Sequence, residues 1–208
     1  MSKSLSASQV LTIKRRTIQL EGGWGDCLGE IDHTGVVLVW GQSGNGKSSA
    51  VMSLAKELTK YGKVLYVSLE EGLALSFQNT IRRYSMQDCG ARFQVVTGVD
   101  IDSLSNRLKK RRSADFVIID SFQYTRLNYK RYLAFKKEHS NKLIIFVSHA
   151  DGRKPAGRAA EWVKYDADQK IWVEGYKAFS NGRYIGKTGE YTIWPEGAAK
   201  YWAGRKTM

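Results

Sequence analysis

The stretch of sequence that decides the fold is Gly41-Gln-Ser-Gly-Asn-Gly-Lys47-Ser48. It follows the apolar, β-branched run 36–40, which is typical of a buried strand, and it precedes the segment 48–60, whose apolar residues recur at helical spacing. Glycines let several backbone N–H groups point at phosphates, the lysine adds positive charge, and the serine hydroxyl can hold Mg²⁺. The stretch therefore predicts a phosphate-binding loop for ATP and Mg²⁺. The residues expected to bind the nucleotide are Gly41, Ser43, Gly44, Asn45, Gly46, Lys47, Ser48 and Ser49.

Apolar runs and helical patterns alternate along the next hundred residues. Further strands are predicted at 63–68, 93–96, 116–120 and 143–148. Helices are predicted at 73–84, 101–112 and 129–139. Continuous apolar strands separated by helices indicate a mostly parallel central sheet that is covered on both faces, and hence the α/β class.

The last quarter of the chain has a different character. The Gly-rich, basic segment 149–161 shows no strong period and is expected to be a loop. Short antiparallel strands that complete one edge of the sheet are predicted at 169–174, 176–180 and 190–194. No internal repeat or linker divides the chain, so we expect a flexible N-terminal tail at 1–12 and a single domain at 13–208, with 13–31 wrapping its edge.

The chain is strongly basic, with 33 Lys and Arg against 20 Asp and Glu, a formal net charge of +13. This excess favours nucleic acid or an acidic surface as a partner, although a soluble basic protein is the simpler interpretation. Cys27 and Cys89 match no zinc spacing and form no disulfide framework, so we interpret them as reduced packing residues. No window suggests a signal peptide or a membrane span, so we expect no membrane association and a cytoplasmic location, in a bacterial or phage-infected cell.

Acidic residues and a histidine follow the predicted strands. Asp120 ends the strand 116–120, so its carboxylate is expected beside the phosphates as a Mg²⁺ ligand with Ser48, and Ser121 is a candidate for the metal's water shell. Glu70 and Glu71 follow the strand 63–68, and we favour Glu70 over Glu71 as the base that orients the attacking water. His149 follows the strand 143–148 and is either a polar sensor of the γ-phosphate or a structural residue.

In this order, these elements resemble the RecA-like P-loop ATPases, particularly the branch with RadA, KaiC and DnaB-type helicase motor domains. The resemblance runs from about Gly22 to Trp194. Its motifs beyond the phosphate-binding loop are Val67-Ser-Leu-Glu70-Glu71, Ser148-His149 and Asn181-Gly-Arg183-Tyr-Ile-Gly186-Lys187-Thr-Gly189-Glu190. It implies a RecA-like core with C-terminal antiparallel strands, ATP hydrolysis and assembly into a homo-oligomer, either a ring or a filament.

The late motif resembles the family segment that reaches the ATP site of a neighbouring subunit. The family writes Lys-x-Arg there, and Arg183 falls on the arginine position. A cation supplied by a neighbour stabilises the charge that develops during phosphoryl transfer. Asn181 stands where the family has lysine, which leaves Lys177 and Lys187 as candidates to replace it. A solvated arginine in a hairpin is the alternative.

The resemblance also implies single-stranded DNA binding through two loops. Aromatic rings beside cations suit stacked bases and a phosphate backbone, whereas the aromatic residues could equally be packing residues. The candidate DNA-binding residues are Phe122, Tyr124, Arg126, Lys130 and Arg131 in the first loop, and Arg153, Lys154 and Arg158 in the second. The basic run 107–112 is either a further positive patch or solvated surface.

We therefore expect a DNA-dependent ATPase in recombination, repair or replication. One alternative is a DnaB-like ring helicase motor. Another is a KaiC-like signalling or scaffold ATPase that binds protein instead of DNA. A small-molecule kinase is the weakest alternative, since no arginine-rich lid is evident.

Overall fold

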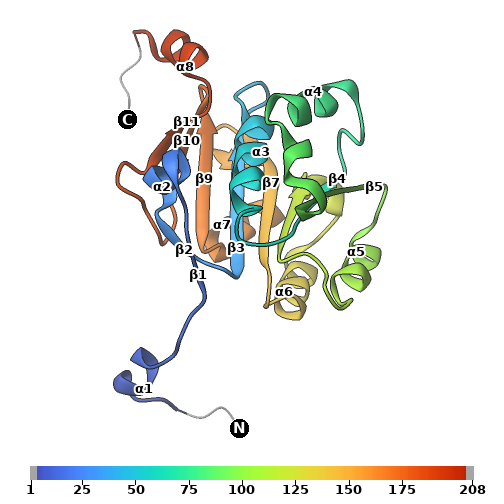
Figure 1. Ribbon diagram of the computed structural model, residues 1–208, viewed down its shortest axis with the longest axis vertical. Coiled ribbons are helices and arrows are strands. Elements are labelled where there is room, and N and C mark those ends of the chain that lie inside the picture. Colours follow the sequence, from blue (N-terminus) through green and yellow to red (C-terminus); the bar gives the residue numbers. More distant parts are fainter. Residues whose placement is uncertain (1–3, 205–208) are drawn as a thin grey trace.

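The computed structural model describes residues 4–204, and its centre is one large mixed sheet (Figure 1). In these residues the strands follow the order β11-β10-β9-β3-β7-β6-β4-β5, and β8 pairs only with β7. Their bounds are β3 (Gly35–Gly41), β4 (Val64–Ser68), β5 (Phe93–Thr97), β6 (Phe116–Asp120), β7 (Leu143–Asp151), β8 (Lys154–Pro155), β9 (Gln169–Glu174), β10 (Lys177–Ser180) and β11 (Glu190–Thr192). The pairs from β9 to β5 are parallel. The predicted α/β class and mostly parallel sheet are confirmed.

Both faces of the sheet are buried, because successive side chains of a strand point to opposite sides. On one face Val37 and Val39 of β3 share a core with α2 (Gly22–Leu28), α3 (Lys47–Leu58) and α4 (Leu75–Arg83). On the other face Val36 and Leu38 share a core with α5 (Ile101–Leu108), α6 (Tyr129–Glu138) and α7 (Arg158–Asp166). This burial explains why the strands read as continuous apolar runs.

The structure adds to one prediction about the late part of the chain and overturns another. The segment 169–174 is antiparallel to β10 as expected, but β9 also pairs in parallel with β3, so it belongs to the central sheet. The segment 149–161 is not a plain loop: β7 continues to Asp151, turns at Gly152 and pairs with β8 before α7 begins. One side of α7 is buried through Ala160 and Val163. This short apolar spacing was overlooked in the sequence because the segment is rich in basic residues and glycine.

Several short elements were not expected. The region 13–31 contains β1 (Thr17–Gln19), α2 and β2 (Glu30–Asp32), with β1 and β2 forming a separate antiparallel pair. Two 3₁₀ segments, η1 (Met86–Arg92) and η2 (Phe122–Thr125), follow α4 and β6, and α8 (Pro195–Trp202) follows β11. The helix predicted at 101–112 ends at Leu108, because the following turn places Arg112 in the left-handed region at φ 63°.

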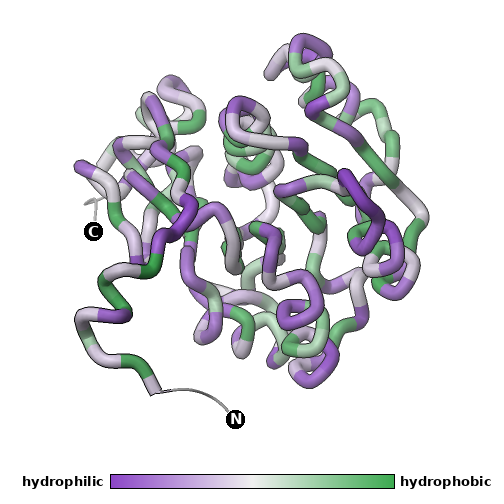
Figure 2. The backbone as a smooth tube through the Cα atoms, turned by 60° about the horizontal axis from the view of Figure 1, so that its bottom comes forward, coloured by the Kyte–Doolittle hydropathy of each residue, from purple (hydrophilic) through white to green (hydrophobic). Residues whose placement is uncertain are grey.

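The N-terminal segment lies apart from the sheet (Figure 1). It carries a short helix, α1 (Ala7–Leu11), which Ser6 and Gln9 cap reciprocally and which buries no residue. Figure 2 shows hydrophobic stretches in this segment, where Val10 and Leu11 are exposed.

Burial raises the pKa of the Cys27 thiol to about 12, and neither Cys27 nor Cys89 forms a disulfide. None of the helices in residues 4–204 combines the length and the apolar character needed to cross a bilayer.

Candidate active site

The phosphate-binding loop joins the end of β3 to the start of α3. Gly44 and Gly46 have φ values of 77° and 94°, a backbone region that favours glycine. α3 begins at Lys47 without a side-chain cap, so the N–H groups of its first turn, around Ser48 and Ser49, are available to an anion. Lys47 Nζ donates to the Gln42 carbonyl at 3.0 Å and so folds back over the loop. The loop therefore has the conformation that phosphate binding requires.

The turn between β9 and β10 braces this loop. The Asn45 side-chain oxygen accepts from Gly175 N at 2.8 Å, and the Asn45 carbonyl accepts from Tyr176 N at 3.2 Å. A Cβ at Gly41 would lie 2.2 Å from the Val173 carbonyl oxygen, so only glycine fits where β3 ends against β9. The shape of the loop thus depends on residues that lie far along the chain.

Asp120 lies at the same edge of the sheet, at the end of β6. Its Oδ2 accepts from Tyr66 Oη at 2.5 Å, and the Asp120 carbonyl accepts from Leu69 N at 2.6 Å. Burial raises the pKa of the Asp120 carboxyl, and the charges of Glu70 and Glu71 raise it further. Burial lowers the pKa of the Lys47 ammonium, an effect that Asp120 and Glu70 oppose. The carboxylates of Asp120, Glu70 and Glu71 therefore lie close enough to influence one another, and Lys47 is the cation beside them.

Glu70 and His149 meet above β6. Glu70 Oε2 lies 3.0 Å from His149 Nε2, and Ser121 Oγ lies 3.4 Å from the same nitrogen. Glu71 is exposed beside Glu70. Because β6 pairs with both β4 and β7, the ends of these neighbouring strands bring Glu70, Asp120 and His149 together. The structure therefore collects four of the sequence-predicted groups, Lys47 included, at the carboxyl edge of the sheet.

These residues fit Mg²⁺ that is held mainly through a bound nucleotide. Among residues 4–204, no group of three or more His, Cys, Asp or Glu side chains could hold a metal alone. Mg²⁺ is commonly held by one or two protein ligands plus substrate phosphates, a role that Ser48 and Asp120 can fill. Burial, and then the charges of Glu70 and Glu71, raise the pKa of Asp120, so a cation bound beside it would favour its charged form.

Two residues of the site escaped the sequence analysis. Tyr66, fully buried in β4, donates to Asp120 as described above. Gln123 donates through Nε2 to Ser148 Oγ at 2.8 Å and to the Ala156 carbonyl at 2.9 Å, and its Oε1 accepts from His149 N at 3.3 Å. Gln123 thus joins the segment after β6 to the end of β7 and to the β8 region. A lone glutamine in a loop carries no pattern that would have revealed this.

Arg183 lies at the opposite edge of the sheet from its own phosphate-binding loop. Its guanidinium pairs with Asp168 Oδ1 at 2.7 Å, while Asp168 Oδ2 accepts from Val36 N at the start of β3. The Arg183 side chain is 66% exposed. Asn181 and Lys187 are also exposed, and Lys177 pairs with Glu190 at 3.1 Å. Arg183 therefore faces outward and away from the Lys47 site of its own chain.

The candidate DNA-binding residues divide into exposed and buried groups. Phe122 was wrongly assigned to a stacking surface: it is 4% exposed and packs edge-on against Phe146 at 5.4 Å in the core. Tyr124 is 55% exposed. Arg131 pairs with Asp102 through two contacts of 2.7 and 2.9 Å. The remaining candidates are exposed, namely Arg126, Lys130, Arg153, Lys154 and Arg158.

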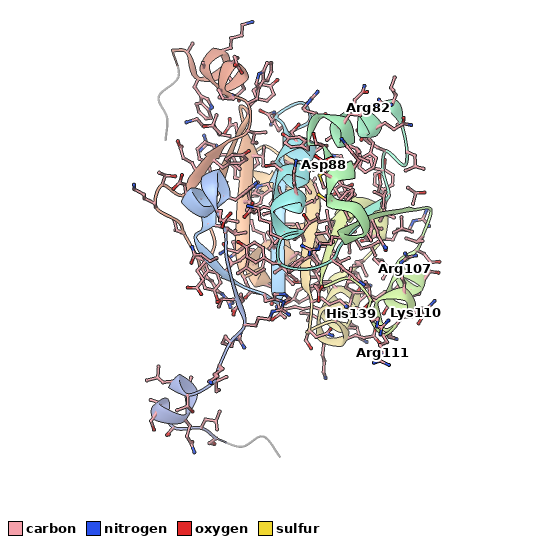
Figure 3. All side chains as sticks on the ribbon, viewed as in Figure 1. Arg82, Asp88, Arg107, Lys110, Arg111 and His139 are labelled. Carbon is pink, nitrogen blue, oxygen red and sulfur yellow. The ribbon has the colours of Figure 1, made fainter. Side chains whose placement is uncertain are left out.

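The basic run 107–112 lies elsewhere, at the end of α5 and near the start of β6. Arg107, Lys110 and Arg111 are labelled with His139 at one end of the molecule in Figure 3. Lys109 pairs with Glu138 at 2.7 Å, whereas Arg107, Lys110 and Arg111 form no ion pair within the described residues. This run is distant in the sheet from the carboxyl edge that carries Lys47.

Known proteins share parts of this sequence and its fold. No protein-family model matches the sequence. DNA repair protein RadA of Streptococcus pneumoniae (strain ATCC BAA-255 / R6) is 33% identical over 88 residues, which are 42% of this chain and 20% of RadA. The chain thus spans about a fifth of the length of that relative.

Two solved structures share the fold over 86% of this chain. The KaiC-like protein PH0186 from Pyrococcus horikoshii OT3 matches with a TM-score of 0.61 and 18% identity over 99% of its length. The flagellar accessory protein FlaH from Methanocaldococcus jannaschii matches with a TM-score of 0.60 and 20% identity over 92% of its length. The chain therefore has the RecA-like α/β fold of these two proteins.

Proposed function

We propose that this chain is an ATPase that binds ATP with Mg²⁺, assembles head to tail and couples nucleotide binding to single-stranded DNA. One observation carries the proposal: the ends of neighbouring strands bring Lys47, Asp120, Glu70 and His149 to one edge of the sheet. Phosphoryl transfer requires this combination of a phosphate cradle, a metal-binding carboxylate and a group that positions the attacking water.

The phosphate cradle binds the nucleotide through the backbone. The uncapped N-terminus of α3 and the positive-φ glycines direct N–H groups at the β- and γ-phosphates, and Lys47 exchanges the Gln42 carbonyl for a phosphate oxygen. Ser48 and Asp120 would hold Mg²⁺, and a bound Mg²⁺ would supply positive charge against the phosphates. Tyr66 keeps the Asp120 carboxylate in place.

Glu70 serves as the base for the attacking water. The contact with His149 Nε2 holds one carboxylate oxygen and leaves the other to accept a proton. Glu71, exposed one residue later, is the second candidate. His149 is the sensor, because a γ-phosphate competes with Glu70 for its ring.

Assembly places the outward-facing Arg183 of one subunit at the ATP site of the next. Its side chain is 66% exposed and is held by a single carboxylate, that of Asp168. A surface ion pair of this kind contributes about 0–1 kcal/mol, so Arg183 can leave Asp168 for a phosphate at low cost. The oligomer is a ring or a filament.

Single-stranded DNA binding is supported by three observations. Exposed cations lie in the β7–β8 hairpin, at Arg153 and Lys154, and the net charge is +13. Gln123 ties this hairpin to the segment that carries Tyr124. The partial match to a DNA repair protein supports a role in recombination, repair or replication.

The test measures ATP hydrolysis with and without single-stranded oligonucleotide, together with oligomer size by light scattering. We expect DNA-stimulated hydrolysis by an oligomer, lost in Lys47→Ala and in Glu70→Gln. Oligonucleotide binding that needs ATP and weakens steeply with salt supports the DNA role. If the protein hydrolyses ATP but neither binds oligonucleotide nor is stimulated by it, a KaiC-like ATPase acting on protein is favoured. Unwinding of a forked duplex would favour a ring helicase.

A further inference from the structure

A cavity of about 570 Å³ lies on the sheet face that carries α7, and residues of α7, β9, β10 and α8 line it. Three of the chain's six tryptophans line it. Its aromatic walls are Trp40, Trp172, Phe179 and Trp202, and we call it the tryptophan pocket. Trp40 and Trp172 lie 5.7 Å apart and form its base, while Phe179 and Trp202 are half-buried with their rings 6.0 Å apart.

The indole N–H groups of the pocket are all satisfied within the protein. Trp40 Nε1 donates to the Arg153 carbonyl at 3.1 Å, Trp172 Nε1 to Glu174 Oε2 at 3.0 Å, and Trp202 Nε1 to the Gly175 carbonyl at 3.1 Å. The rings are therefore fixed in position and offer faces and edges rather than donors. A pocket of this kind favours a flat aromatic ligand without selecting its hydrogen-bonding pattern.

The rim of the pocket carries unpaired positive charge. Lys164 Nζ lies 4.6 Å from the centre of the Trp40 ring, and Arg153 lines the same cavity. Within the described residues neither cation forms an ion pair, whereas Glu190, the carboxylate of the lining, is paired with Lys177 at 3.1 Å. The charge of the rim therefore suits an anionic group attached to the aromatic ligand.

We propose that the tryptophan pocket receives one unpaired base of a single-stranded nucleic acid, with the adjoining phosphate at Arg153 and Lys164. The inference rests on the proposed function, because Arg153 belongs to the β7–β8 hairpin assigned there to DNA. The Trp40–Arg153 hydrogen bond makes the hairpin and the pocket one continuous surface. Stacking on Trp202 and Phe179 holds the base, and the backbone then continues along the basic hairpin.

The test measures binding of a fluorescein-labelled oligo-dT in the presence of Mg²⁺ and a non-hydrolysable ATP analogue. We expect Trp202→Ala to weaken binding about tenfold and Trp202→Phe, which keeps a stacking ring, to weaken it less. Lys164→Ala should lower the slope of log affinity against log salt by about one, whereas Lys137→Ala, an exposed lysine on α6, should leave the affinity unchanged.

Tryptophan emission reports the contact directly, using unlabelled oligo-dT. The emission change on DNA addition should shrink in Trp202→Phe and persist in Trp194→Phe, which removes an exposed indole outside the pocket. Thermal unfolding verifies that each variant is folded. If Trp202→Ala does not fold, Trp202→Phe and Lys164→Ala test the pocket instead.

The outcomes separate this inference from the proposed function. Wild-type affinity in the Trp202 and Lys164 variants would overturn the pocket and leave DNA binding intact. No oligonucleotide binding by the wild-type protein would overturn both. A change in oligomer size in Trp202→Ala, without a change in DNA affinity, would assign the pocket to a second copy of the chain, whose exposed Val10 and Leu11 could fill it.

Discussion

Glu70 Oε2 lies 3.0 Å from His149 Nε2, although Glu70 follows β4 and His149 lies near the end of β7, two strands that do not pair with each other. The strand between them, β6, ends in Asp120. The contact therefore joins the residues on either side of Asp120, the proposed metal ligand, and fixes the direction in which Glu70 faces.

Removing the Glu70 carboxylate should stop hydrolysis without stopping ATP binding. We expect Glu70→Gln to lower the single-turnover rate by a factor of about 10²–10⁴, because general-base catalysis contributes that much. His149→Ala should lower the rate by a smaller factor, since in this proposal His149 contacts Glu70 and senses the γ-phosphate but does not take the proton. Glu71→Gln is the matched control, and a larger loss there than in Glu70→Gln would reverse the assignment. Rapid quench and a fluorescent nucleotide measure rate and affinity.

Asp120→Asn should stabilise the nucleotide-free protein at neutral pH. Burial raises the pKa of Asp120 in the folded state, so the folded protein binds a proton more readily than the unfolded chain does. Stability therefore falls as pH rises through the folded-state pKa. The gain in melting temperature should be present at pH 7 and vanish in acid, where the carboxyl is protonated in both states. A variant that is less stable than wild type at pH 7 would contradict this account.

Asn45→Ala should destabilise the protein as well as weaken ATP binding. The change leaves the buried N–H of Gly175 without its acceptor, which costs about 1–3 kcal/mol. Asn45→Asp keeps an acceptor oxygen, so it should retain stability while its charge repels the phosphates. Chemical denaturation of both variants without nucleotide checks the difference, and equal stabilities would argue against the brace.

Gln123→Ala should loosen the β7–β8 hairpin. Its two donated hydrogen bonds contribute on the order of 1 kcal/mol each, so local opening should rise about thirtyfold. Limited trypsin digestion should then cut faster after Arg153. The control is Gln87→Ala, an exposed glutamine whose side chain has no hydrogen-bond partner within residues 4–204. Unchanged cleavage would show that the hairpin is held by other contacts.

The role of Arg183 in a neighbouring site can be tested by mixing subunits. Lys47→Ala and Arg183→Ala proteins should each be inactive, and random mixing pairs an intact loop with an intact arginine at about one interface in four. Partial recovery of hydrolysis is therefore expected. No recovery from folded, assembled variants would exclude the trans role. Arg183→Ala should hardly change stability, because its ion pair with Asp168 is exposed.

The sequence pattern was sufficient to predict the strands whose own residues are almost all apolar. The apolar runs of β3, β4, β6 and β7 were predicted correctly because both faces of these strands are covered, whereas β5, at the edge, is only partly buried. The glycines around Lys47 indicated a tight turn. Asp120 was placed correctly at a strand end for the same reason.

Features that depend on distant partners were not visible in the sequence. β9 pairs in parallel with β3, and nothing within 169–174 encodes that neighbour. Phe122 was predicted to be an exposed loop residue, but it packs in the core against Phe146 of β7. The pairing of Arg183 with Asp168 is likewise a product of the β9–β10 arrangement.

The hydrogen bond between Asn45 and Gly175 joins residues 130 positions apart. A chain emerging from the ribosome therefore makes its glycine-rich turn long before the segment that shapes it exists. Such long-range closure is slow and comes late in folding. We expect the protein to bind nucleotide only after the final strands have docked. ATP would then bind and stabilise fully folded chains but not partly synthesised ones.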